Sequence, residues 1–135
     1  MNSRRSVLKT LAVAMLCSAA SPILAQTRRT DTIRALDTDS DGTIDLAEAK
    51  KAASAVFAKL DRDHDDTLSR RELLGRLSER EFNAADPDHD GTLTMEEYLG
   101  LVEQRFNAAN LDKDGTLDAK ELDTRAGRAL LHLIR

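Results

Sequence analysis

The sequence has few aromatic residues and almost no cysteine. Aromatic residues make up 3% of the 135 residues, tryptophan is absent, and the single cysteine is Cys17. A disulfide within the chain is therefore excluded, and a hydrophobic core must be built mainly from leucine, isoleucine, valine and alanine. A basic excess is also missing, because 20 Lys and Arg stand against 24 Asp and Glu. This balance disfavours nucleic-acid binding, which requires a basic surface.

Residues 1–25 have the features of an export signal. Arg4 and Arg5 precede a short apolar run at 11–16 and a stretch of small residues, a pattern that resembles a bacterial twin-arginine signal. The apolar run is shorter than the ~20 residues that a transmembrane helix needs, and a retained membrane anchor is the alternative interpretation. We therefore expect a periplasmic protein with one mature domain over 26–135 and no membrane contact after cleavage.

Four acidic segments recur along the chain at nearly constant spacing. Their first residues are 24, 25 and 24 positions apart, which identifies an internal repeat. We call them loops 1 to 4, and they span residues 37–48, 61–72, 86–97 and 110–121.

Each loop fits or nearly fits the EF-hand calcium-loop pattern, in which oxygen ligands stand at positions 1, 3, 5, 7, 9 and 12. Side chains at positions 1, 3 and 5 of a tight turn converge, position 7 offers a backbone carbonyl, and a glutamate at position 12 offers two oxygens. Position 6 needs a positive φ, which Gly42, Gly91 and Gly115 adopt readily and Asp66 tolerates. A single match could be a solvated polar turn, but four in register predict metal sites.

Two further positions of the loop pattern, 4 and 8, are not expected to bind metal. Position 4 of loops 2 and 3 carries His64 and His89, whose side chains we expect to point into solvent and not to bind metal. Position 8 is apolar in every loop and typically forms a short β-bridge with a partner loop. It is occupied by Ile44, Leu68, Leu93 and Leu117.

Negative charge is concentrated in the loops. They hold 19 of the 24 acidic residues, and their net charges in chain order are −5, −2, −5 and −2. Without residues 1–25 the chain has a net charge of −7, so the mature chain outside the loops carries +7. Charge therefore ranks loops 1 and 3 first. Loop 2 is the candidate for the weakest site, because it has Asp66 at position 6, Ser69 at position 9 and three arginines. Repulsion between clustered carboxylates predicts a poorly ordered metal-free chain that folds when it binds metal.

The spacers between loops are unusually short, with 12, 13 and 12 residues. One helix must therefore serve two loops at 49–60 and at 98–109, where apolar residues recur with helical periodicity. In the middle spacer, Gly75 interrupts the pattern and Ser78-x-x-Glu81 is a capping box that can restart a helix. We predict a bend there that pairs loop 2 with loop 3 and leaves loop 1 to pair with loop 4.

The predicted fold is all-α. It is a compact helical bundle with four EF-hand loops joined by short shared helices. A helix near residues 30–36 leads into loop 1, and a closing helix contains Ala126, Leu130, Leu133 and Ile134.

Several features together resemble the lanmodulin family of periplasmic lanthanide-binding proteins. They are the short spacers, the acidic position 9 of loops 1 and 4, the Asn that begins loop 4, the export signal and the ending over 126–135. The resemblance covers 30–135 and implies selective binding of trivalent lanthanides over calcium, with ordering of the chain. Lanthanides match calcium in size but carry one more charge, so they gain more from an added carboxylate, which Asp45 and Asp118 supply.

The resemblance also implies a ligand set, carried over position by position. Ser69 and Thr94 replace the family's Asp at position 9, and we expect them to act through water. The implied ligands are Asp37, Asp39, Asp41, Thr43, Asp45 and Glu48 in loop 1; Asp61, Asp63, Asp65, Thr67 and Glu72 in loop 2; Asp86, Asp88, Asp90, Thr92, Thr94 and Glu97 in loop 3; and Asn110, Asp112, Asp114, Thr116, Asp118 and Glu121 in loop 4.

The leading hypothesis is lanthanide uptake, buffering or delivery in the periplasm, with Ca²⁺ as a weaker ligand and a periplasmic protein as a candidate partner. The alternative is a calcium sensor or buffer that acts on a protein partner. Such sensors commonly expose a methionine-rich groove, whereas Met95 is the only methionine after residue 25. An enzyme is the third class, and the sequence offers it no nucleophile and base pair, open zinc site or nucleotide loop. We therefore expect no catalysis.

Overall fold

The computed structural model describes residues 30–135, and the predicted export signal lies outside them. A helix covers residues 30–36 and ends at loop 1, where the amide of Asp37 donates to the carbonyl of Ile33 at 2.7 Å. This is the incoming helix that the sequence predicts. Within the described residues, no helix is both long enough and apolar enough to cross a membrane.

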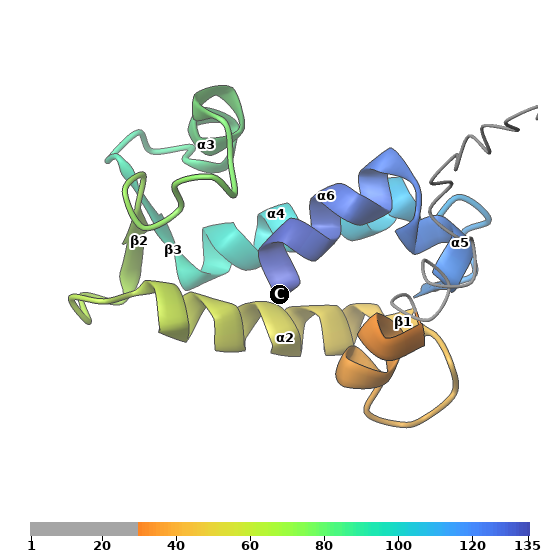
Figure 1. Ribbon diagram of the computed structural model, residues 1–135. Coiled ribbons are helices and arrows are strands. Elements are labelled where there is room, and N and C mark those ends of the chain that lie inside the picture. Colours follow the sequence, from red (N-terminus) through yellow and green to blue (C-terminus); the bar gives the residue numbers. More distant parts are fainter. Residues whose placement is uncertain (1–29) are drawn as a thin grey trace, which may run out of the picture.

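Two long helices, α2 (Leu46–Leu60) and α4 (Met95–Ala109), run in opposite directions along the molecule (Figure 1). Each is 15 residues long, which separates the loops at its two ends by roughly 20 Å at 1.5 Å per residue. Each buries one stripe, which includes Ala53 and Phe57 in α2 and Val102 in α4. As predicted, one helix serves two loops in both places.

Both long helices begin inside a loop, at a capping box. Asp45 accepts a hydrogen bond from the amide of Glu48 at 2.7 Å, and Glu48 Oε2 accepts one from the amide of Asp45 at 3.1 Å. Thr94 and Glu97 form the same reciprocal pair at the start of α4. A cap of this kind contributes about 1 kcal/mol to helix stability. Loop positions 9 and 12 therefore start the helix that follows.

The loops pair as two short antiparallel ribbons at opposite ends of the long helices (Figure 1). Loop 1 pairs with loop 4, and loop 2 pairs with loop 3, which confirms the predicted pairing. The strands are β1 (Ile44–Asp45) with β4 (Thr116–Leu117), and β2 (Thr67–Ser69) with β3 (Thr92–Thr94).

The apolar residues at position 8 face one another across these ribbons. Ile44 lies opposite Leu117, and Leu68 lies opposite Leu93. All four side chains are fully buried, so each pair joins two loops by hydrophobic contact. The structural role predicted for position 8 is confirmed.

The middle connection bends as predicted. After loop 2 the chain makes a turn in which Gly75 has a φ of +82° and Leu73 is buried. The capping box of Ser78 and Glu81 then starts α3 (Glu79–Ala85), which leads into loop 3. Loop 2 is therefore followed by a turn, and only loop 3 has a helix at this junction, as the interruption at Gly75 and the capping box of Ser78 predicted. The shared helices are those at the other two spacers.

The predicted closing helix, with Ala126, Leu130, Leu133 and Ile134, is confirmed, and a short helix that was not predicted precedes it. Helix α5 (Ala119–Leu122) is short, and α6 (Arg125–Ile134) packs against α4 and α2. The hydroxyl of Tyr98 on α4 donates to the carbonyl of Leu133 on α6 at 2.7 Å. Burial raises the pKa of Tyr98 to about 12, so this hydroxyl stays protonated and holds α6 in place.

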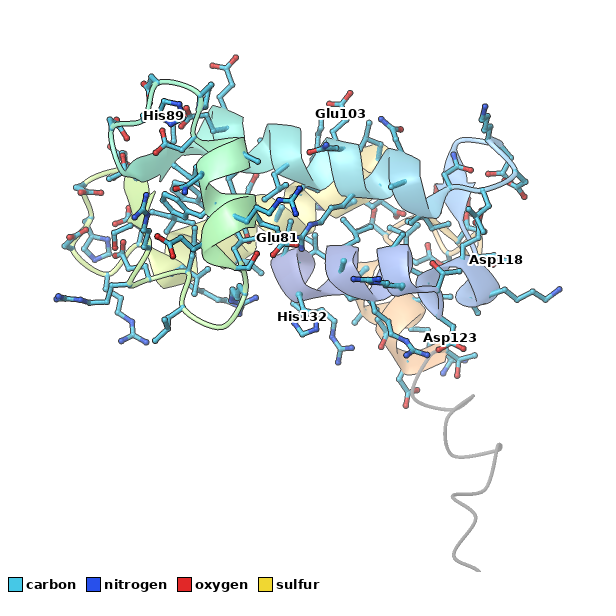
Figure 2. All side chains as sticks on the ribbon, turned by 90° about the horizontal axis from the view of Figure 1, so that it is seen from above. Glu81, His89, Glu103, Asp118, Asp123 and His132 are labelled. Carbon is cyan, nitrogen blue, oxygen red and sulfur yellow. The ribbon has the colours of Figure 1, made fainter. Side chains whose placement is uncertain are left out.

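Arg105 links three helices by hydrogen bonds. Arg105 on α4 donates to the carbonyl of Ala129 on α6 at 2.6 Å and to Glu81 Oε1 on α3 at 2.9 Å. Figure 2 shows Glu81 directed toward these helices. The Arg105 side chain is only 11% exposed, so this pair is less screened by solvent than an ordinary surface salt bridge. It positions α3, and through α3 the entry to loop 3.

The contact between α5 and α6 predicts how two glycines respond to substitution. A Cβ on Gly127 would lie 2.2 Å from the carbonyl oxygen of Glu121 and 2.5 Å from Leu122 Cα, whereas a Cβ on Gly100 in α4 would meet nothing within 4 Å. Gly127→Ala should therefore lower the free energy of unfolding by roughly 1–3 kcal/mol. Gly100→Ala should raise it by roughly 0.5–1 kcal/mol, because alanine favours a helix interior.

Urea unfolding of the folded chain, followed by helical circular dichroism, measures both changes. Gly100→Ala is the matched control, since it makes the same chemical change in another helix. Equal stabilities for the two variants would contradict the close α5–α6 contact.

Candidate metal centre

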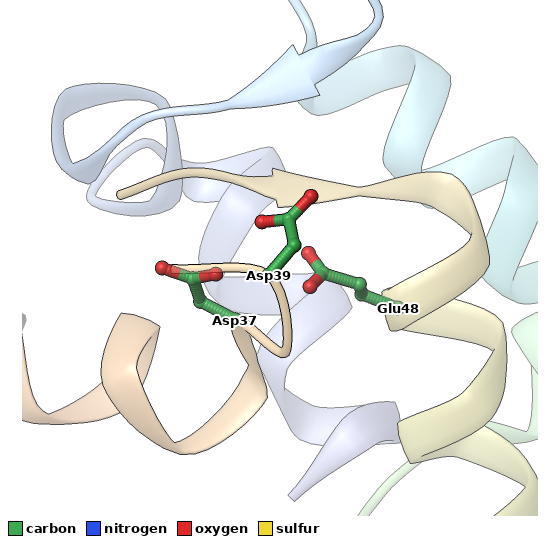
Figure 3. A group of neighbouring side chains, drawn as sticks. All are labelled: Asp37, Asp39 and Glu48. Atoms are coloured by element: carbon green, nitrogen blue, oxygen red, sulfur yellow. The ribbon is translucent and has the colours of Figure 1, made fainter. Parts of the chain in front are cut away.

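Three carboxylates converge in loop 1 (Figure 3). Asp37 and Asp39 come from the loop and Glu48 from the first turn of α2, and one oxygen from each lies within 4.8 Å of the others. Oxygens that share one calcium-sized ion at 2.3–2.6 Å can be at most about 5 Å apart. The group is therefore compact enough to hold one hard cation.

The same grouping occurs at the same positions in two more loops. Carboxylates at positions 1, 3 and 12 again approach within 4.8 Å. The sequence repeat therefore places the same three carboxylates close together in each of these loops. The groups are Asp61, Asp63 and Glu72 in loop 2, and Asp86, Asp88 and Glu97 in loop 3.

Loop 4 differs because Asn110 stands at position 1, so only Asp112 and Glu121 are acidic at the equivalent positions. Its asparagine oxygen, Asn110 Oδ1, is buried and has no hydrogen-bond partner, and the same is true of Asp86 Oδ1 at position 1 of loop 3. A buried oxygen without a partner costs free energy unless something satisfies it. Hard cations prefer such oxygens, so the donor sets of both loops fit a metal ion.

Position 5 lies outside the close acidic groups. In every loop, Oδ1 of the position-5 aspartate accepts hydrogen bonds from both the amide and the hydroxyl of the threonine at position 7, at 2.7–3.0 Å. This interaction shapes the turn and engages one of the two carboxylate oxygens. The position-5 aspartates and the position-7 carbonyls stay predicted ligands. The pairs are Asp41 with Thr43, Asp65 with Thr67, Asp90 with Thr92, and Asp114 with Thr116.

Position 9 has a role that the sequence analysis missed. Asp118 Oδ1 accepts the amides of Lys120 and Glu121 at 2.7 and 2.8 Å and caps α5, as Asp45 caps α2. The signal was visible as a Ser, Thr or Asp followed three residues later by Glu. The extra carboxylates that Asp45 and Asp118 were expected to offer a metal lie outside the close acidic groups, and their ligation stays a prediction.

The backbone of the loops has the strain that the pattern requires. Gly42, Gly91 and Gly115 have φ of 87°, 87° and 93°, and Asp66 has a φ of 65°. Position 4 also has a positive φ, for example 58° at His89, which is exposed (Figure 2). His64 is exposed too, and neither histidine joins an acidic group among the described residues.

In loops 1 and 3 the carboxylates at position 1, Asp37 and Asp86, have lowered pKa values. The amide of Gly42 donates to Asp37 Oδ2 at 2.9 Å and lowers the pKa of Asp37. For Asp86, desolvation raises the pKa, but the amide of Gly91 at 3.0 Å and other hydrogen bonds lower it further. These groups are therefore held in the charged form that binds a cation.

In loops 1 to 3 the carboxylates at position 3 have raised pKa values. The position-5 amide lowers the pKa of Asp39 and of Asp88, but desolvation and neighbouring carboxyl groups raise it more. Desolvation and the charge of Asp65 raise the pKa of Asp63. In loops 1 to 3 the position-3 carboxylate is therefore the one whose pKa is raised by repulsion from the neighbouring carboxylates.

Two comparisons with known proteins agree with this geometry. A family model described as EF hand matches residues 30–51 and 79–102, which contain loops 1 and 3. Lanmodulin of Methylorubrum extorquens is 52% identical to this chain over 71 residues. That match covers 53% of each protein, so the chain spans about half the length of this relative. Both findings support a lanmodulin-like protein with EF-hand metal-binding motifs, as the sequence resemblance indicated.

The opposed pKa shifts predict the order of protonation in the metal-free chain. Asp39 and Asp88 should take up protons at higher pH than Asp37 and Asp86, because their pKa values are raised and those of the position-1 groups are lowered. A cation must displace these protons, so metal affinity should fall as the pH drops through the raised pKa values.

Carboxyl ¹³C chemical shifts measured against pH resolve the individual groups. Asp39→Asn serves as the assignment control, since it should remove one of the higher midpoints. Midpoints for Asp37 and Asp86 at or above those of Asp39 and Asp88 would contradict this account of the loop electrostatics.

Proposed function

We propose that the protein binds trivalent lanthanide ions in four EF-hand loops in the periplasm, folds as it binds them, and serves lanthanide uptake, buffering or delivery. The observation that carries the proposal is the set of converging oxygens at positions 1, 3 and 12, together with the buried, unpartnered oxygens of Asp86 and Asn110. These oxygens are arranged for a hard cation.

Loop 4 belongs to the proposal although it lacks a third acid. It pairs with loop 1 through β1 and β4, and its Glu121 accepts the amides of Asp118 and Leu111 as the equivalent glutamates do in loops 1 and 2. Its buried Asn110 Oδ1 takes the place of a carboxylate oxygen. The lower charge makes it a weaker site than loop 1.

Charge supports a trivalent ion over calcium. Loops 1 and 3 each carry −5, more than two positive charges can neutralise. A third positive charge gains additional Coulomb energy from every carboxylate at the same distance. The lanmodulin-like sequence supports the same choice, since the family resemblance implies lanthanide selectivity.

The position of the glutamates supports folding on binding. An ion that joins Asp37 to Glu48 would join the end of helix 30–36 to the start of α2, because the two residues stand at those helix termini. Without an ion, the same carboxylates repel one another at the helix termini. Binding then relieves the repulsion and holds the helices together, so its free energy contributes to folding.

The cellular role rests on the sequence of residues 1–25, which predicts export to the periplasm. We propose binding and release of ions and no catalysis, in keeping with the metal-binding relative. A periplasmic protein that receives the ion is the partner that delivery requires.

A titration with lanthanum and with calcium tests the choice of ion. Lanthanum should raise the helicity of the chelator-treated chain at a free concentration at least about a hundredfold lower than calcium, since the third charge adds Coulomb energy in every loop. Far-ultraviolet circular dichroism with buffered free metal measures both. Calcium acting at comparable free concentration would favour the calcium sensor, and full helicity in excess chelator would remove the proposed coupling to folding.

Two neighbouring glutamates in loop 3 test the ligand assignment. Glu97→Gln removes a carboxylate from the acidic group, whereas Glu96→Gln removes the same charge from an exposed neighbour outside it. Glu97→Gln should weaken lanthanum binding in loop 3 on the order of 10- to 100-fold, with a much smaller effect of Glu96→Gln. Isothermal titration calorimetry measures the difference, and equal losses would mean that only the overall charge matters.

A further inference from the structure

The glutamate at position 12 is hydrogen-bonded by its own loop. In all four loops its Oε2 accepts the amide of the position-9 residue, at 2.8–3.1 Å. This is the capping-box bond, and it is common to all loops. The pairs are Glu48 with Asp45, Glu72 with Ser69, Glu97 with Thr94, and Glu121 with Asp118.

The other carboxylate oxygen, Oε1, is hydrogen-bonded differently in loop 3 than in the other three loops. In loops 1, 2 and 4 it accepts the backbone amide of the residue at position 2, so both glutamate oxygens are engaged by the protein. The donors are Thr38 to Glu48, Arg62 to Glu72 at 3.1 Å, and Leu111 to Glu121 at 2.8 Å.

Loop 3 has Pro87 at position 2, and proline has no amide hydrogen to donate. Across the described residues, no hydrogen bond reaches Glu97 Oε1. The first ligand of the same loop is open as well, because Asp86 is 1% exposed and its Oδ1 has no partner. In loop 1, by contrast, both oxygens of Asp37 accept backbone amides.

We propose that the position-2 amide competes with the metal ion for the closing glutamate, and that Pro87 removes this competitor so that loop 3 loads first. The inference rests on the proposed function. A glutamate that closes an EF-hand site offers both oxygens to the ion. In loops 1, 2 and 4 Oε1 already gives one lone pair to an amide, so the ion competes with that hydrogen bond for the same oxygen. In loop 3 that oxygen has no such competitor.

Loops 1 and 3 make a fair comparison because charge does not favour loop 3. Both carry −5, and loop 1 has the additional aspartate Asp45 where loop 3 has Thr94. Charge alone therefore predicts that loop 1 binds at least as tightly. A hydrogen bond to a charged group is worth about a tenfold change in affinity or more, which is enough to reverse that order.

The backbone indicates that a second proline can be accommodated. The residue before Pro87, Asp86, has a ψ of 85°. Asn110, which precedes Leu111 in loop 4, has a ψ of 87°. Leu111 is 67% exposed, so its replacement does not disturb the core.

Amide resonances at position 6 report the loading order in the wild-type chain. During titration of the ¹⁵N-labelled chain with lanthanum, the Gly91 signal of loop 3 should change before the Gly42 signal of loop 1 and the Gly115 signal of loop 4. Pro87→Ala restores an amide hydrogen and should lower the affinity of loop 3 about tenfold. The inference is overturned if Gly42 responds first or together with Gly91, or if Pro87→Ala leaves the order unchanged.

Loop 4 provides the converse test with a matched control. Leu111→Pro removes the amide that holds Glu121 and should raise the affinity of loop 4 about tenfold. Leu111→Ala keeps the amide and should leave that affinity unchanged, and an equal effect of the two variants would overturn the inference. If lanthanum moved none of the position-6 signals, the proposed function itself would be wrong. If lanthanum bound but Leu111→Pro left the loading order of the four loops as it is in the wild-type chain, only this inference would be wrong.

Discussion

The glutamate at position 12 connects each loop to the fold. Its Oε2 completes the capping box that starts α2, α4 and α5, and its carboxylate also joins the acidic group of its loop in loops 1 to 3. Whatever holds the carboxylate therefore also acts on the first turn of a helix. Helices α2 and α4 each run from one loop to the next. A change in the loop at one end can therefore affect the loop at the other end through the helix.

The pairing of the loops links each loop to one other loop at the same end of the bundle. Loops 1 and 4 meet at one end, loops 2 and 3 at the other, and each pair is joined by two fully buried apolar side chains. The helices α2, α4 and α6 pack between the two ends, with Tyr98 and Arg105 linking α4 to α6. A change in one loop can thus be transmitted to its partner loop across a ribbon and to the opposite pair along a helix, which gives a physical basis for the proposed coupling of binding to folding.

The loops are equivalent in pattern but unequal in environment. Loop 2 carries three arginines and a strained Asp66, loop 4 has an amide in place of a carboxylate, and loops 1 and 3 share the highest charge. Hydrogen bonds then divide loops 1 and 3, because both oxygens of Asp37 are engaged and one oxygen of Asp86 is not. Under the proposed competition for each oxygen, charge alone does not rank the loops.

The sequence was sufficient to predict the positions of the loops, the two helices that each join two loops, the facing apolar residues at position 8 and the bend at Gly75. These features follow from spacing, periodicity and local backbone preference, which are properties of neighbouring residues. Only the folded structure shows the break before α6, the close approach of Gly127 to α5, the opposed pKa shifts at positions 1 and 3 of loops 1 and 3, and the unpartnered oxygen of Asp86. Each of these depends on which groups meet through space and on how far water is excluded from them, and a linear pattern does not contain that information.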